Sequence, residues 1–381
     1  MAKRTLDAFF KPSAPPPKRP KTSSEPTTSN STTSPEPPNI PTEDPKPPSQ
    51  HPSYPFPIPQ LPSHISIALE HATPATQPKK TTNQPHLDLL TFQPYIARQT
   101  STALFTFLLQ SLPFYRVTYK IRRGPTETQI NTPRFTTVFG VDSTSTFAQT
   151  DTSSPLGLLE THTNNPVPKT KYQCVPRPIP ACLDLLRRTV EKANTDSKGR
   201  TPGYNFCLVN YYASGEDSIA FHSDDERFLG AQPNIASLSL GGERDFLMKH
   251  KPFVDTGVSN GAGAAGTRVS GTRVTGVSGT VSGGGLDGSA TTPVQQIKMK
   301  LGSGDMVVMR GETQANWLHS IPKRKGRAGE MTRGRINITF RRAVVPGGTD
   351  NYYRYNVGSG GMYRWDEVAR KMVLQDDGKT C

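Results

Sequence analysis

The sequence is poor in cysteine and contains no long apolar run. Its four cysteines are Cys174, Cys182, Cys207 and Cys381, and no two of them form a Cys-x-x-Cys pair, which argues against a zinc knuckle. No run of about 18 apolar residues predicts a transmembrane helix, and the first residues carry no signal-peptide pattern. We therefore expect free thiols in a reducing intracellular compartment.

Apolar residues are also scarce in this chain. Hydrophobic residues make up 33% of it, beside 37 prolines and 32 glycines, and such a composition predicts that part of the chain is disordered. Residues 1–85 consist mainly of Pro, Ser, Thr and Lys without periodicity, so they bury too little apolar area to offset the chain entropy. We expect a disordered arm over 1–85 and one buried core in the remainder.

Acidic residues are outnumbered by basic ones. The chain has 45 Lys and Arg against 31 Asp and Glu, which gives a net charge of +14 and a pI near 9.6. An excess of this size favours a polyanionic partner, and nucleic acid is the first candidate. An acidic membrane surface, or a basic tail that only keeps the chain soluble, is the alternative.

The arm begins with a short apolar motif, KRTLDAFF at residues 3–10. It resembles the peptide motif that docks on the sliding clamp of replication, which inserts an aliphatic side chain and two aromatic rings into a pocket. Lys3 stands where that motif usually has Gln. Docking through Leu6, Phe9 and Phe10 is one interpretation, and a chance apolar cluster is the other.

A basic cluster, KRPK at residues 18–21, follows in the same arm. Short clusters of Lys and Arg in a disordered segment are typical of nuclear localisation signals, and equally of solvated charge runs. With the clamp-like motif, the cluster leads us to expect a nuclear protein.

Regular elements are expected from about residue 86. Apolar residues recur with helical spacing over 100–112 and over 180–193, where Pro180 stands near the helix start. Strands and a turn are expected over 118–142, and a loop over 150–170.

Beyond residue 203 the pattern changes to a series of strands separated by polar turns. We expect eight of them, at 204–212, 218–222, 234–240, 244–251, 294–301, 305–310, 316–321 and 335–342. Residues 257–292 are Gly, Ser, Thr and Val with few other residues, which predicts a flexible insertion between strands. Eight short strands predict a mainly β (α+β) fold, a double-stranded β-helix or jelly roll with N-terminal helices.

These patterns divide the chain into four parts. They are the arm 1–85, a nucleotide-recognition region with supporting helices over 86–202, a core over 203–342 with the insertion 257–292, and a C-terminal extension over 343–381. We expect the extension to form a strand pair packed on the core, and the whole chain to be a monomer.

His222 and Asp224 stand two residues apart in the sequence FHSD. On a strand, residues i and i+2 point to the same side, about 7 Å apart along the chain, so both can reach one metal ion. His319 is the candidate third ligand. Two histidines and one carboxylate form the facial triad of non-heme Fe(II) oxygenases. A zinc site uses similar ligands, and a chance surface pair is a further alternative.

The last expected strand, 335–341, reads RINITFR. Period two places its three apolar residues on one face and Arg335, Asn337, Thr339 and Arg341 on the other. A polar face in water is one interpretation of this pattern. The other is a polar cavity that holds a dicarboxylate, because the planar guanidinium group binds a carboxylate through two hydrogen bonds.

The order His222-x-Asp224, then His319, then Arg335 to Arg341 resembles the AlkB family of Fe(II)- and 2-oxoglutarate-dependent dioxygenases, and its nuclear DNA-repair branch in particular. The resemblance covers residues 200–342 best. It implies oxidative removal of alkyl groups from nucleic-acid bases, with Fe(II), 2-oxoglutarate and O2. The residues that it implies as iron ligands are His222, Asp224 and His319, and those implied for 2-oxoglutarate are Asn210, Tyr212, Arg335, Asn337, Thr339 and Arg341.

The same resemblance implies that Asp225 and Glu226 approach the damaged base. A carboxylate there suits 1-methyladenine or 3-methylcytosine, because alkylation at those ring nitrogens makes the base cationic. The base must leave the duplex to be reached, and an aromatic side chain is expected to stack on it. The candidates for this stacking are Phe135, Phe139, Phe147 and Tyr172.

Contacts to nucleic acid are expected from basic residues. Arg134 belongs to a Pro-Arg stretch that resembles the family's segment before its base-reading strand. The loop after His319 carries further candidates for phosphate contacts, namely Lys323, Arg324, Lys325 and Arg327, and Arg268 and Arg273 of the insertion extend that set. DNA, single- or double-stranded, is the expected partner. A related oxygenase acting on RNA or protein, and a non-catalytic nucleic-acid- or clamp-binding protein, are the alternatives.

Overall fold

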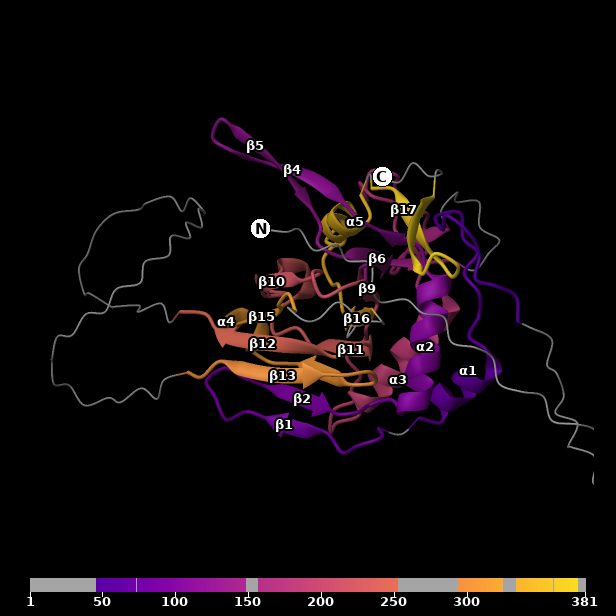
Figure 1. Ribbon diagram of the computed structural model, residues 1–381. Coiled ribbons are helices and arrows are strands. Elements are labelled where there is room, and N and C mark those ends of the chain that lie inside the picture. The colour runs from indigo at the N-terminus through magenta and orange to yellow at the C-terminus, as the bar shows by residue number, and fades with distance from the viewer. Residues whose placement is uncertain are drawn as a thin grey trace, which may run out of the picture. The chain divides into compact units, whose positions relative to one another are not determined.

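The computed structural model describes residues 46–72, 74–148, 157–252, 294–324, 334–358 and 360–375. Two antiparallel sheets dominate these residues (Figure 1). The larger contains, in spatial order, β1 (Lys79–Thr81), β2 (Leu89–Phe92), β14 (Met306–Met309), β11 (Ile235–Gly241), β16 (Arg335–Arg341), β9 (Phe206–Tyr212), β6 (Phe135–Gly140), β3 (Phe114–Tyr115), β17 (Met362–Asp366) and β18 (Lys371–Gln375). The smaller contains β10 (Ile219–His222), β15 (Trp317–Ile321), β12 (Arg244–His250) and β13 (Ile297–Leu301).

Two hairpins lie outside these sheets. They are β4 (Thr118–Arg123) with β5 (Thr126–Asn131), and β7 (Ser145–Phe147) with β8 (Leu158–Glu160). The β4–β5 hairpin extends away from both sheets in Figure 1. The strand β8 is a correction, because a loop was expected over 150–170.

Helices cover one face of the larger sheet. They are α1 (Ser63–Glu70), α2 (Arg98–Ser111) and α3 (Ala181–Ala193), and the short elements α4 (Thr313–Asn316), α5 (Asp350–Asn356) and η1 (Arg227–Leu229) lie elsewhere. Leu104 and Leu108 of α2 pack in one apolar cluster with Ile336, Ile338 and Phe340 of β16. Because the apolar face of β16 is buried against the helices, its polar face points into the space between the sheets.

The eight strands expected after residue 203 are all present, with ends within three residues of the expected ones. The helices expected at 100–112 and 180–193 are α2 and α3, and the strand pair expected in the C-terminal extension is β17–β18. The jelly-roll expectation is therefore confirmed.

The prediction of a disordered arm over residues 1–85 was wrong for its second half. Ile58, Ile65 and Leu69 are at most 2% exposed and belong to the main core. Apolar side chains that are sparse along the sequence come together here because α1 aligns Ile65 and Leu69 on one face. The clamp-like motif and the basic cluster lie outside the described residues, as do Arg268, Arg273, Lys325 and Arg327.

Cys174, Cys182 and Cys207 are buried, and Cys182 and Cys207 are free thiols, whereas Cys381 lies outside the described residues. Within the described ranges, every helix is too short or too polar to span a membrane.

Candidate metal centre

The three predicted metal ligands come together at the smaller sheet, where β10 ends. His222 ends β10 and lies directly opposite His319 of β15 in the strand register, with 4.2 Å between the ring centroids. Asp224 follows β10, and Nε2 of His319 lies 3.8 Å from its Oδ2. One ligand atom from each residue lies within 4.8 Å of the others. This is the spacing of side chains that can share a single ion.

Both imidazoles are held in the form that binds metal. His222 donates from Nδ1 to the backbone oxygen of Ala220 over 2.9 Å. Because a carbonyl only accepts, this bond places the proton on Nδ1 and leaves the Nε2 lone pair for an ion. Burial lowers the pKa of His319 to about 3 and also lowers the pKa of His222. Both rings are therefore neutral near pH 7.

Asp224 is buried and ionised. Burial by itself would raise the pKa of its carboxyl group, but Arg341 and the two imidazoles outweigh that effect and hold the pKa well below its usual value. Arg341 donates from Nη2 to Oδ2 over 2.8 Å. The backbone N–H of Asp224 donates to Oε1 of Gln314 over 2.9 Å, which fixes the chain at this position. The centre thus offers two neutral donors and one anion, as Fe(II) or Zn prefers.

A cavity of about 130 Å³ lies beside the three ligands. The polar face of β16 forms one wall of it, through Arg335, Asn337, Thr339 and Arg341. Residues of β9, whose backbone pairs with β16, continue this wall, and they are Leu208, Asn210 and Tyr212. The structure therefore brings together every residue that the sequence indicated for the co-substrate.

The two arginines stand at opposite ends of the polar face of β16. Arg341 lies at the metal end, against Asp224, whereas Arg335 donates to Oγ of Ser239 over 2.9 Å and lies 5.3 Å from the centroid of the Tyr212 ring. Burial lowers the pKa of Arg335 to about 10, so the guanidinium keeps its charge at neutral pH. A positive group is thus available at each end of the cavity.

The guanidinium groups are incompletely paired. In the described part of the chain, Nε and Nη1 of both Arg335 and Arg341 are buried without a hydrogen-bond partner. Leaving a buried charged donor unpaired costs more than about 1–3 kcal/mol. A dicarboxylate such as 2-oxoglutarate would satisfy these donors at both ends, and a metal ion would be bound by one ring nitrogen of each histidine. The residues present therefore fit both groups.

The remaining predicted co-substrate residues already have protein partners. Arg134 donates from Nε to Oδ1 of Asn210 over 2.7 Å, and Asn337 donates from Nδ2 to Oγ of Ser237 over 2.9 Å. Thr339 donates to the backbone oxygen of Leu208. We expected Arg134 to contact nucleic acid. In the structure its side chain lines the cavity beside the metal ligands.

Of the two acidic residues expected at a substrate base, only Glu226 lines the cavity. Burial and the neighbouring Asp224 raise the pKa of Glu226. The carboxylate of Asp225 lies 3.4 Å from Nζ of Lys251, at the exposed surface. Their side chains diverge because successive residues of an extended segment point to opposite sides.

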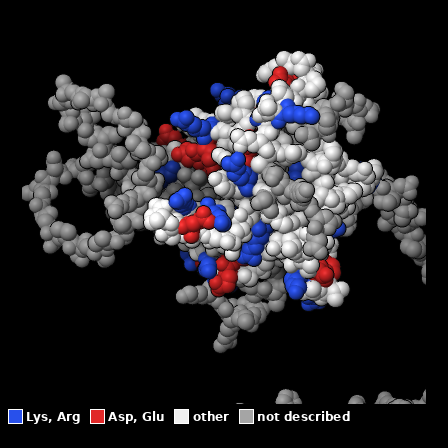
Figure 2. All heavy atoms as spheres, turned by 90° about the horizontal axis from the view of Figure 1, so that it is seen from above, with Lys and Arg blue, Asp and Glu red and all other residues white. Residues whose placement is uncertain are grey.

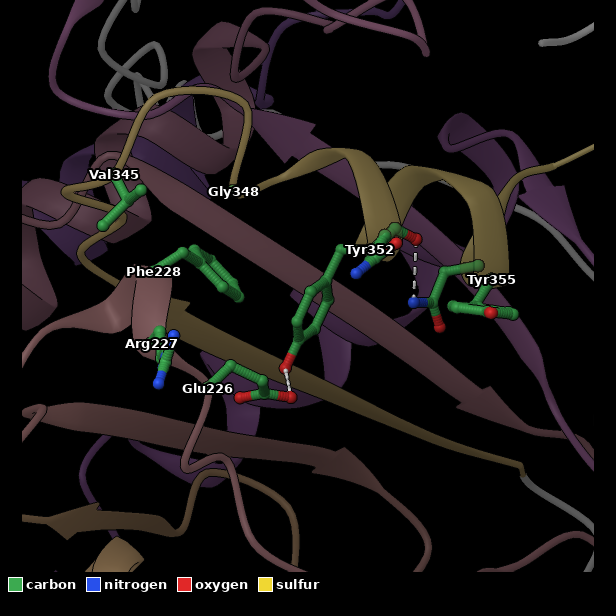
Figure 3. Close-up of a pocket in the computed structure, with 9 residues that line it drawn as sticks. Glu226, Arg227, Phe228, Val345, Gly348, Tyr352 and Tyr355 are labelled. Atoms are coloured by element: carbon green, nitrogen blue, oxygen red, sulfur yellow. Dashed lines mark hydrogen bonds between the residues drawn. The ribbon is translucent and has the colours of Figure 1, made fainter. Parts of the chain in front are cut away.

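Tyr352 of α5 is a site residue that the sequence did not reveal. Its hydroxyl donates to Oε1 of Glu226 over 3.0 Å (Figure 3), and it also lies 3.3 Å from Oδ1 of Asp224. Its ring lies 5.0 Å from the guanidinium carbon of Arg341. Only tertiary folding brings α5 to this place, so no local pattern could have identified it. Gln314 was missed for the same reason.

The aromatic candidates for stacking on a base do not line the cavity. Phe135 and Phe139 are buried in the core, and Tyr172 donates to Asp142. Phe147 packs against His51. Aromatic side chains are more often packed in a core than placed at the mouth of a cavity, so the sequence alone could not show which one stacks on a base.

Lys323 and Arg324, the described basic residues after β15, also lie away from the cavity. Nζ of Lys323 lies 3.2 Å from Oε2 of Glu216, and Arg324 donates to the backbone oxygen of Glu243. Both line a separate, small depression. Figure 2 shows basic side chains interspersed with acidic ones on the face that it presents, rather than gathered into one patch.

Comparison with known proteins agrees with this geometry. The model of the 2OG-Fe(II) oxygenase superfamily matches residues 88–341. DNA oxidative demethylase ALKBH2 of Arabidopsis thaliana is 37% identical over 140 residues, which cover 36% of this chain and 37% of that protein. Human alpha-ketoglutarate-dependent dioxygenase alkB homolog 3 is 30% identical over 175 residues, or 46% of this chain and 48% of that protein. The chain spans less than half the length of these relatives.

Proposed function

Because the chain belongs to the 2OG-Fe(II) oxygenase superfamily and is similar to DNA oxidative demethylase ALKBH2, we propose that it is an AlkB-type enzyme that oxidatively demethylates alkylated bases in DNA. The proposed substrates are 1-methyladenine and 3-methylcytosine, and the outcome is direct reversal of the damage. When bound, Fe(II), 2-oxoglutarate and O2 supply the oxidation, in which 2-oxoglutarate becomes succinate and CO2 and the hydroxylated methyl group leaves as formaldehyde.

The observation that carries this proposal is the His-Asp-His triad, in which Asp224 and His319 are buried, beside two arginines that are incompletely paired among the described residues. His222, Asp224 and His319 would hold Fe(II). Arg341 would bind the carboxylate at the metal end of 2-oxoglutarate and Arg335 the other one, because both arginines line the cavity and have N–H groups without a partner in the described part of the chain. The walls of the cavity would be completed by Asn210, Tyr212, Asn337 and Thr339. The protein thereby orients the reactants and keeps the centre from bulk water.

The proposed base contact is the carboxylate of Glu226, held by the Tyr352 hydroxyl. A base methylated at a Watson–Crick nitrogen carries a positive charge, and an adjacent carboxylate stabilises it. Asp225 stays in the proposal as an outer contact, because its carboxylate is at the surface beside Lys251. Flipping the base from a duplex costs roughly a few kcal/mol, and less where methylation has already broken its pairing.

The proposed contacts to phosphates come from Arg134, Lys323, Arg324 and Lys325. The net charge of +14 supports a polyanionic partner. A relative named as a DNA oxidative demethylase favours DNA over RNA or protein as the substrate. Nuclear localisation and docking of Leu6, Phe9 and Phe10 on the replication clamp are proposed from the sequence of residues 3–21, with the chain acting as a monomer.

A succinate-release assay on methylated oligonucleotides tests the proposed function. Protein with Fe(II), 2-oxoglutarate and O2 is given single- and double-stranded DNA, RNA and a methylated peptide, and the mass of each product is measured. We expect loss of the methyl group from DNA that contains 3-methylcytosine. The His222→Ala variant should lose turnover and still bind DNA. Turnover of RNA or peptide alone would assign a different substrate, and unchanged turnover by His222→Ala would end the proposal.

A further inference from the structure

A second cavity, of about 680 Å³, opens beneath α5 (Figure 3). We call it the α5 pocket, and it lies between η1 and α5, with Phe228 on one side and Tyr355 on the other. Its volume is within the range of about 300–1,000 Å³ that is usual for ligand pockets. The family model ends at residue 341, so α5 lies outside the matched segment.

The α5 pocket shares a wall with the cavity beside the three metal ligands, which we call the iron cavity. Glu226, Tyr352 and Asn356 line both spaces. The Tyr352 ring projects from α5 toward Glu226 (Figure 3), and its hydroxyl contacts the carboxylates of Glu226 and Asp224. Tyr352 and Glu226 therefore form a partition. A group in the α5 pocket lies next to the group that occupies the iron cavity, and it is not itself the group that reacts.

The walls of the α5 pocket suit a flat, partly polar ring. Phe228 and Tyr352 meet edge to face with 5.4 Å between their centroids. Val345 is 42% exposed and Tyr355 is 48% exposed, although both are large apolar side chains. Such exposure at the rim of a cavity is typical of a binding surface. Tyrosine rings of this kind stack on nucleobases of any sequence.

Polar groups are present at the same rim. Asn351 is an exposed lining residue whose amide both donates and accepts, as the edge of a base requires. Arg227 is also an exposed lining residue, and its guanidinium group matches the charge of a backbone phosphate. Aromatic faces, an amide and an arginine together point to a nucleotide rather than to a lipid or an apolar peptide.

We propose that the α5 pocket binds the nucleobase that neighbours the target base in an unpaired substrate strand. The proposal rests on the proposed function, since it requires a target base at the iron centre. A neighbouring base reaches the pocket only if it leaves its own stack and pair. The pocket therefore favours single-stranded substrates over duplexes, and substrates of two or more nucleotides over a methylated nucleoside.

The test uses single strands that carry 3-methylcytosine with 2-aminopurine on its 5′ or its 3′ side. Full-length protein is loaded with Mn(II) and 2-oxoglutarate, so that binding is read without turnover. Stacking quenches 2-aminopurine, so emission should fall on binding for one of the two flanking positions. The Tyr355→Ala variant should lose this quenching. In the Fe(II) enzyme it should raise the KM for the oligonucleotide by about fivefold or more, and leave turnover of the methylated nucleoside unchanged.

Leu374→Ala is the matched control, because Leu374 is also about half exposed, at 50%, and belongs to β18, which does not line the α5 pocket. It should behave as the wild type, and Asn351→Ala should weaken quenching in the same direction as Tyr355→Ala. Equal loss of nucleoside and oligonucleotide turnover in Tyr355→Ala would mean that the pocket holds the target base, which overturns the inference. Absence of quenching at both flanks in an active enzyme would overturn it too. An enzyme without turnover that still shows the quenching would contradict the proposed function alone.

Discussion

Arg341 donates a hydrogen bond of 2.8 Å to Asp224, and the two side chains are only 3% and 4% exposed. The contact joins a metal ligand to an arginine that also lines the co-substrate cavity and has two N–H groups without a partner among the described residues. One guanidinium group therefore serves two purposes. It keeps the carboxylate ionised for the metal, and it supplies positive charge at the metal end of the cavity.

Substitution of Arg341 should affect metal binding, which distinguishes Arg341 from Arg335. In Arg341→Met the buried Asp224 loses its cation, so its pKa rises and its affinity for metal falls. We expect Mn(II) to bind about 10–100-fold more weakly, as for other partners of metal ligands. Titration calorimetry measures this directly. Wild-type affinity in Arg341→Met would show that the histidines and Asp224 need no support from the arginine.

Arg335→Met should give the complementary result. Arg335 lies beside Ser239 and Tyr212, away from the metal ligands, so Mn(II) affinity should stay within about twofold. Loss of a buried charged partner costs about 2–5 kcal/mol, and we expect the KM for 2-oxoglutarate to rise about 100-fold or more. Uncoupled succinate production at increasing 2-oxoglutarate measures it. An unchanged KM would place the second carboxylate elsewhere.

Metal binding should resist mild acid. The unprotonated imidazole is the metal-binding form, and burial lowers the pKa of His319 to about 3 and also lowers that of His222. An ordinary histidine of pKa about 6.5 is about 90% protonated at pH 5.5, whereas His319 stays neutral there. Asp224, whose pKa is also depressed, remains ionised. Mn(II) affinity in a non-chelating buffer should therefore fall between pH 7 and 5.5 by less than the roughly tenfold loss that a single ordinary histidine ligand would cause. A tenfold loss per histidine would contradict this.

Much of the metal centre could be predicted from sequence because its residues lie on strands. A period of two sends His222 and the polar residues of β16 inward, and it buries Ile336 and Ile338 on the other face. The register between β10 and β15 then places His319 opposite His222. Alternating side chains are visible in a sequence, whereas His319 could be named as the third ligand only through the family resemblance.

The elements that were missed lack such a local pattern. Tyr352 reaches Asp224 and Glu226 from a short helix far along the chain, in a segment whose composition indicates no function. Residues 46–72 were assigned to a disordered arm because their apolar side chains are few. Ile58 and Leu69 are nevertheless fully buried, and the core that buries them comes from distant segments.

The ordering of α1 can be tested by stability. Leu69 is completely buried in the main cluster, so Leu69→Ala should lower the free energy of unfolding by about 2–5 kcal/mol. Ile67 is 55% exposed on the same helix, and Ile67→Ala should change stability by less than about 0.5 kcal/mol. Urea unfolding followed by tryptophan fluorescence compares the two. Equal, small effects of the two substitutions on the free energy of unfolding would indicate that α1 is disordered.

The Tyr352 hydroxyl should act on the substrate rather than on the metal. Burial raises the pKa of Tyr352 well above its ordinary value, so the hydroxyl keeps its proton and donates to Glu226. Its contact with Asp224 is longer, at 3.3 Å. In Tyr352→Phe the ring and the partition remain, but Glu226 loses a hydrogen bond to a charged group, worth about 1.5–3 kcal/mol.

We therefore expect Tyr352→Phe to lower kcat/KM on a methylated oligonucleotide by about tenfold or more, chiefly through KM. Mn(II) affinity and the KM for 2-oxoglutarate should stay within about twofold. Tyr355→Phe, which alters a tyrosine of the same helix outside the iron cavity, is the control and should match the wild type. If Tyr352→Phe instead lost Mn(II) affinity, the hydroxyl would support Asp224. An unchanged KM for the oligonucleotide would mean that the Glu226 carboxylate keeps its position without the Tyr352 hydroxyl. The backbone that follows Asp224 would then be sufficient to position it.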